Sequence, residues 1–238
     1  MIEGSTLNLV AFNELKNDPS YAALLEATPE DLASTVMNLV RSYNPENPVI
    51  CMDETPKQLI GETKIPIKAS PGYLSRHDYE YKRNGVCSIF MANEPLMGKR
   101  CASITETKKK KDWAVFIKSI SDQYLKAKKI TLVMDNYGTY SIGAFYDVFP
   151  PEEAKGLIDR FEFIYTPKHG SWLNMAEIEL NVMQKQCIGG RIADIKTLAY
   201  EVNEWVADRN SKTYTINWQF TNKDSRIKLK RLYPTINQ

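Results

Sequence analysis

Apolar runs and helical periodicity alternate along most of the chain, and this pattern predicts a mixed α/β domain. Strands are predicted where apolar residues run together, at residues 49–52, 86–92, 101–105, 130–134 and 161–165. Helices are predicted where apolar residues recur at helical spacing, at residues 112–124, 150–159, 172–187 and 194–209. Three strands in succession, followed by alternating helices and strands, predict a mixed sheet with helices on both faces.

The first 44 residues are predicted to form a separate helical segment. Thr28 is placed to cap a helix that has Pro29 at its first position and acidic residues in its first turn. Two prolines, at positions 45 and 48, then end the helical pattern. We therefore divide the chain into a helical N-terminal segment, residues 1–44, and a mixed-sheet domain with a helical C-terminal extension, residues 45–238.

Composition excludes several classes of protein. Of the 238 residues, 43% are hydrophobic and 25% are charged, as in ordinary globular domains. No apolar run is long enough to span a bilayer, and the N-terminus does not resemble a signal peptide. The four cysteines are scattered without a paired spacing, which argues against a zinc site or a disulfide scaffold and favours a reducing cytoplasm.

Basic residues are clustered although the net charge is only +2. Clustered lysine and arginine side chains are what binding to a phosphate backbone requires, although solvated surfaces show the same pattern. Lys168 and the adjacent His169 are further candidates, because they precede the helix predicted at residues 172–187. The clustered candidates for phosphate contacts are Lys108, Lys109, Lys110, Lys111, Arg226, Lys228, Lys230 and Arg231.

Two of the predicted strands run directly into an acidic residue. The first ends in Asp53 and Glu54, and the fourth ends in Asp135. On neighbouring strands these carboxylates would lie close together and would require a shared proton or a divalent cation, for which Mg²⁺ or Mn²⁺ suits oxygen ligands. Such a site is suited to phosphodiester chemistry. The alternative is that each aspartate only caps the turn after its strand.

A third acid is expected from the helix at residues 172–187. Glu177 and Glu179 lie on opposite borders of its apolar face, so helical periodicity leaves both open.

Three sequence blocks resemble the signature blocks of mariner-like bacterial DDE transposases of the insertion sequence 630 group. They are residues 53–55 (Asp-Glu-Thr), residues 133–136 (Val-Met-Asp-Asn) and residues 166–177, which read Thr-Pro-Lys-His-Gly-Ser-Trp-Leu-Asn-Met-Ala-Glu. Shorter matches at residues 78–81, 83–85, 194–198, 218–221 and 226–234 extend the resemblance over about four-fifths of the chain.

This resemblance implies a ribonuclease-H-like fold and a catalytic, metal-binding triad of Asp53, Asp135 and Glu177. Glu177 is preferred over Glu179 because it matches the acid of the Leu-Asn-x-x-Glu pattern. The resemblance further implies cleavage at transposon ends, strand transfer to target DNA, and a bacterial cytoplasmic protein that associates with the nucleoid. Mg²⁺ or Mn²⁺ would be the cofactor, and DNA the partner, with no membrane involved.

The chain departs from the family pattern in two ways that keep alternatives open. Tyr140 stands where the family has histidine, and residues 1–44 are too short for the usual helix-turn-helix modules. We therefore expect a homodimer or a separate DNA-binding subunit to supply DNA recognition. One alternative is a catalytically silent remnant that binds DNA or another subunit; a weaker one is a ribonuclease-H-like nuclease acting on RNA–DNA hybrids.

Overall fold

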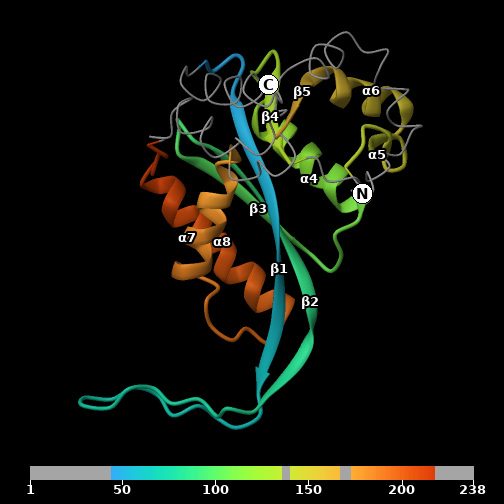
Figure 1. The fold of residues 1–238 in the computed structure, drawn as a ribbon. Coiled ribbons are helices and arrows are strands. Elements are labelled where there is room, and N and C mark those ends of the chain that lie inside the picture. The colour runs from blue at the N-terminus through green and yellow to red at the C-terminus, as the bar shows by residue number, and fades with distance from the viewer. Residues whose placement is uncertain (1–43, 136–139, 167–172, 218–238) are drawn as a thin grey trace, which may run out of the picture.

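The computed structural model describes residues 44–135, 140–166 and 173–217, which form a five-stranded mixed sheet with helices on both faces (Figure 1). The strand order across the sheet is β3-β2-β1-β4-β5. The first three strands form an antiparallel meander, and β4 and β5 continue the sheet parallel to β1. The strands are β1 (Val49–Glu62), β2 (Tyr81–Glu94), β3 (Lys99–Thr105), β4 (Ile130–Met134) and β5 (Phe161–Tyr165).

The described helices divide between the two faces of the sheet (Figure 1). One face is covered by α4 (Lys110–Gln123), α5 (Gly143–Tyr146) and α6 (Pro151–Arg160). The other face is covered by α7 (Ala176–Gln186) and α8 (Ile195–Ser211). None of the described helices has both the length and the apolar character needed to cross a membrane.

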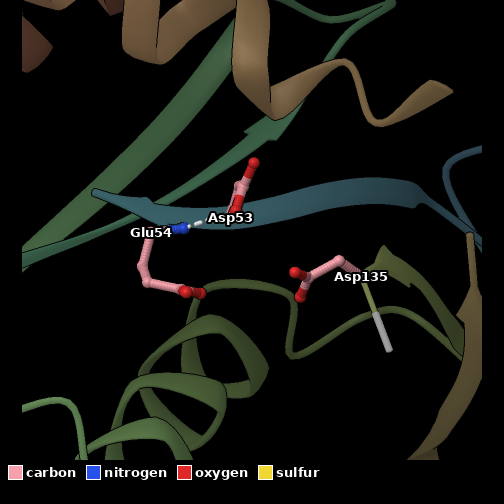
Figure 2. A group of neighbouring side chains, drawn as sticks. All are labelled: Asp53, Glu54 and Asp135. Atoms are coloured by element: carbon pink, nitrogen blue, oxygen red, sulfur yellow. Dashed lines mark hydrogen bonds between the residues drawn. The ribbon is translucent and has the colours of Figure 1, made fainter. Parts of the chain in front are cut away.

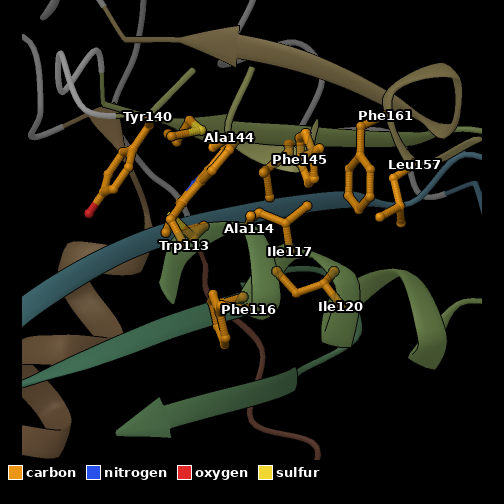
Figure 3. Close-up of a cluster of buried hydrophobic side chains, with 14 of the residues drawn as sticks. Trp113, Ala114, Phe116, Ile117, Ile120, Tyr140, Ala144, Phe145, Leu157 and Phe161 are labelled. Carbon is orange, nitrogen blue, oxygen red and sulfur yellow. The ribbon is translucent and has the colours of Figure 1, made fainter. Parts of the chain in front are cut away.

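A separate apolar cluster lies under each layer of helices, because side chains alternate between the two faces of a strand. On β2, Phe90 and Ala92 join the cluster under α4, whereas Ile89 and Met91 join the cluster under α7 and α8. Trp113 of α4 is fully buried at the centre of the first cluster, among the aromatic rings seen in Figure 3. The sheet therefore separates two apolar cores and contributes side chains to both.

The predicted elements are confirmed with several corrections to their bounds. Strands β4 and β5 have the predicted ends, but β1 and β2 are much longer than their apolar runs. Their outer parts pair with each other, where β2 is exposed and most of β1 is only partly buried, so no apolar run marks them. Helix α5 was not predicted, and α7 begins at Ala176, later than expected. The helix expected near Pro29 lies outside the described residues.

Candidate active site

The register of the two central parallel strands brings Asp53 and Asp135 together. Strands β1 and β4 pair through Cys51↔Val133, and the same offset, continued by two residues, sets Asp53 opposite Asp135. The side chains of Asp53, Glu54 and Asp135 each offer a carboxylate oxygen, and these three oxygens lie within 4.8 Å of one another (Figure 2). Three acidic groups therefore converge where β4 ends and β1 continues alone beside β2.

Asp53 and Glu54 approach this point from opposite faces of β1. Met52 packs in the cluster under α4, so Glu54 shares that face, and Asp53 points to the face covered by α7. Figure 2 shows the two side chains leaving the strand in opposite directions. Neither acid ends the strand, because β1 extends to Glu62; the expectation of a strand that ends at Asp53 is wrong.

Burial and repulsion by neighbouring acids disfavour the ionised forms of Asp53 and Asp135. Burial is the main cause that raises the pKa of Asp53 to about 7, and the charges of Glu54, Asp135 and Glu177 add to the rise. The Glu54 N–H, which donates to Asp53 Oδ1 at 2.8 Å, acts in the opposite direction. Burial also raises the pKa of Asp135, with further contributions from Glu54 and Glu177. A bound cation would relieve this repulsion.

The two acids of α7 have different surroundings. Glu177, in the first turn, is partly buried, and its charge acts on both Asp53 and Asp135. Glu179 points into a buried ion cluster, where Arg100 Nε and Nη2 donate to its carboxylate at 2.8 and 3.0 Å and Arg209 donates at 3.1 and 3.2 Å. Of the two candidates that periodicity left open, Glu177 is the one that acts on the other acids.

Glu54 has partners that the sequence did not indicate. The Lys108 ammonium group forms an ion pair with its carboxylate, and the charge of Lys108 opposes the pKa rise of Asp135. Burial is the main cause that raises the pKa of Tyr140, and the interaction of its hydroxyl with Glu54 and the charges of Asp135 and Asp53 add to the rise. The Tyr140 ring stacks on Trp113 with centroids 5.5 Å apart, and its hydroxyl points out of the apolar cluster (Figure 3).

Comparison with protein-family models finds a match over residues 48–199 to the DDE superfamily endonuclease family. This range includes the acidic residues of the site, which are Asp53, Glu54, Asp135 and Glu177. The chain belongs to the DDE superfamily endonucleases. A comparison with curated proteins finds no match.

Solved structures similar to this DDE endonuclease are those of the Mos1 mariner transposase. Its paired-end complex with Mn has 10% sequence identity and a TM-score of 0.53, with 86% of this chain and 59% of that chain covered. Its strand transfer complex has 11% identity and a TM-score of 0.50, covering 86% and 58% of the two chains. The chain thus spans about three-fifths of the length of these structures. The likeness confirms the ribonuclease-H-like fold.

The basic residues expected to contact DNA divide into three groups in this DDE endonuclease. Lys108 belongs to the acidic site through Glu54. Lys109, Lys110 and Lys111 are exposed around the start of α4, and Lys110 forms an ion pair with Asp147. The remaining candidates lie outside the described residues: Lys168, His169, Arg226, Lys228, Lys230 and Arg231.

The raised pKa of Asp53 predicts a pH-dependent cost to the stability of the metal-free DDE endonuclease. In the unfolded chain this group ionises near pH 4, whereas in the folded protein it holds its proton until about pH 7. Between these values the unfolded state gives up the proton more readily, so the contribution of Asp53 to the free energy of unfolding falls as pH rises. Asp53→Asn removes this contribution.

Urea denaturation of both proteins in a chelating buffer, at pH 4.5 and pH 7.5, measures the effect. We expect Asp53→Asn to gain stability relative to wild type as pH rises, because titrating groups far from the site contribute equally to both proteins and only Asp53 and the acids that repel it differ. A difference between the two proteins that does not change with pH would contradict the raised pKa.

Proposed function

We propose that this chain is the DNA-cleaving and strand-joining domain of a mariner-like transposase of the bacterial insertion sequence 630 group. The observation that carries the proposal is the convergence of Asp53 and Asp135 across two parallel strands, together with the charge of Glu177 on α7, which acts on both. The family match supports endonuclease chemistry, and the three signature blocks support the narrower group.

Asp53, Asp135 and Glu177 would hold Mg²⁺ or Mn²⁺ in this proposal. The donor set fits such ions, because carboxylate oxygens are their usual protein ligands. The raised pKa values of Asp53 and Asp135 also fit, because a cation would stabilise the ionised form that repulsion now disfavours. When bound, the ions would supply the charge that activates the attacking oxygen and stabilises the leaving oxygen of a phosphodiester.

Glu54 would act beside this triad rather than within it. Its carboxylate is engaged by Lys108 and Tyr140 on the face of β1 opposite to Asp53. The Lys108 ammonium group would thereby offset part of the negative charge that a DNA phosphate meets on approach. The exposed Lys109 and Lys111 would add non-specific phosphate contacts, which carry no base specificity.

The DNA substrates would be transposon ends and target DNA, recognised by a homodimer or with a separate DNA-binding subunit. The similar Mos1 structures are described as a paired-end complex and a strand transfer complex, which supports this assignment by analogy of fold. We propose the bacterial cytoplasm, in association with the nucleoid, as the location.

A supercoiled plasmid tests the proposal directly. Incubation with the purified chain and Mn²⁺ is expected to produce nicked circles, and a chelator is expected to prevent this. An RNA–DNA hybrid of the same length serves as the control substrate and is expected to remain uncut. Preferential cutting of the hybrid would replace the transposase proposal with a ribonuclease-H-like one.

A non-enzymatic DNA- or subunit-binding protein is the second candidate. Tyr140, which stands where the family has histidine, favours it, because its hydroxyl meets Glu54 at the edge of the site. In the plasmid assay this candidate predicts binding without nicking at every Mn²⁺ concentration.

A further inference from the structure

Asn174 is a buried polar residue just before α7, with only 1% of its surface exposed. Buried amides need hydrogen-bond partners, and both ends of this one have them. Its Nδ2 donates to the main-chain carbonyl of Met52 at 2.6 Å, and its Oδ1 accepts from the N–H of Ala176 at 3.1 Å. One side chain thus joins β1 to the start of α7.

Each of these partners is the neighbour of an acid in the site. Met52 precedes Asp53 in β1, and Ala176 precedes Glu177 in α7. The main-chain carbonyl of Asn174 also accepts from the N–H of Glu177 itself, at 3.2 Å. Met52 lies one residue beyond Cys51, the last residue of β1 that pairs with β4. The Asn174 side chain therefore bonds to β1 just where its pairing with β4 ends.

The surroundings of Asn174 make this connection rigid. Leu173, Met175 and Ala176 are all buried against the sheet, with 1% or less of their surface exposed. Cys51, on the same face of β1 as Asp53, is also fully buried. The segment before α7 is therefore held by burial and by the hydrogen bond of the amide to β1.

We infer that Asn174 is a positioning residue that sets the separation of Asp53 and Glu177. This inference rests on the proposed function, in which both acids hold the metal. Side chains that orient metal ligands typically contribute 10–100-fold to metal affinity. Without the amide, β1 and α7 would still pack, but the two acids would lose their direct link.

Asn210 provides a matched control for the loss of a bridging asparagine. Its Nδ2 donates to the Arg100 carbonyl at 2.8 Å, and its Oδ1 accepts from the Arg100 N–H at 2.9 Å. It therefore joins α8 to β3 with one donated and one accepted main-chain bond, as Asn174 makes, but Arg100 does not adjoin an acid of the site. Asn174→Ala and Asn210→Ala should lose similar amounts of folding stability.

A third variant separates the two bonds of Asn174. In Asn174→Ser the short hydroxyl can still accept from the N–H of Ala176, as serine commonly does at helix starts. It cannot span the distance to the Met52 carbonyl. We expect it to recover part of the stability lost in Asn174→Ala without recovering the link to β1.

The measurement is Mn²⁺ binding to each folded variant, read from the electron paramagnetic resonance signal of free Mn²⁺. Asn174→Ala and Asn174→Ser are expected to bind about 10–100-fold more weakly than wild type, and Asn210→Ala is expected to match wild type. Urea denaturation gives the stabilities in parallel. Should Asn174→Ala fail to fold, the Mn²⁺ affinity of Asn174→Ser, compared with that of wild type, tests the inference alone.

Two results would overturn the inference. One is a wild-type protein that binds Mn²⁺ together with an Asn174→Ser variant that binds it equally well. The other is an equal loss of affinity in the Asn174 and Asn210 variants, which would show a general effect of stability. A wild-type protein that takes up no Mn²⁺ would instead contradict the proposed metal site itself.

Discussion

Asp135→Asn and Glu177→Gln are expected to lower Mn²⁺-dependent plasmid nicking by about a thousandfold each. Both changes keep the size of the side chain but remove a charged oxygen ligand, and metal ions contribute several kcal/mol to such reactions. Neither variant should be less stable than wild type, because each relieves repulsion among the acids around Asp53. Both variants are thus expected to lose activity without losing stability.

Initial rates of plasmid nicking and urea denaturation midpoints measure the two quantities on the same preparations. Glu204→Gln, an exposed acid on α8, is the control for the loss of one negative charge and should keep the wild-type rate. If Glu177→Gln kept more than about a tenth of the activity, which corresponds to a loss of less than 1.4 kcal/mol, the assignment of Glu177 to the triad would be wrong.

Glu179→Ala is expected to destabilise the protein by about 3–5 kcal/mol, as is typical when one partner of a buried ion pair is removed. The Arg100 side chain is only 1% exposed and would lose both bonds to the Glu179 carboxylate. Its other bonds run to main-chain carbonyls, which do not neutralise its charge. This loss is large compared with the stability of an ordinary domain.

Urea denaturation of Glu179→Ala beside Glu177→Ala measures the contrast. Glu177→Ala should keep the wild-type midpoint, and Glu179→Ala should unfold at much lower urea. Equal midpoints would show that the ion cluster adds nothing to stability. The two acids are thus expected to differ in what they support: Glu177→Ala should lose activity at unchanged stability, whereas Glu179→Ala should lose stability and keep its activity while it is folded.

The sequence predicted the bounds of two short strands correctly and failed for the outer parts of the two long ones. Strands β4 and β5 are marked by their apolar runs, and their ends were predicted correctly. The outer half of β1 carries no such run, because most of its residues are only partly buried and it is held by pairing with β2. An apolar run in the sequence marks a short strand such as β4. Beyond Asp53, β1 is held by its pairing with β2, which such a run does not reveal.

In the site, too, local sequence patterns predict only part of the contacts between side chains. The repeated strand-then-acid pattern was enough to predict that Asp53 and Asp135 meet, because parallel neighbours share an edge. The strand pattern also implies that Glu54 faces away from Asp53. Its pairing with Lys108 depends on the path of the chain between β3 and α4, which no local pattern contains. The surroundings of Glu179 depend in the same way on Arg100 and Arg209, which are far apart in sequence.

Because the Glu179 ion cluster is buried, high ionic strength should weaken the surface charge interactions of this protein much more than the interactions within the cluster. At about 1 M salt, charges on the surface are screened over about 3 Å, whereas buried pairs are screened much less. Exposed lysines such as Lys109 and Lys111 would then release bound nucleic acid, while the cluster of Arg100, Glu179 and Arg209 would still hold α7 against β3 and α8. A high-salt wash during purification is therefore expected to remove any bound nucleic acid and to leave the protein folded.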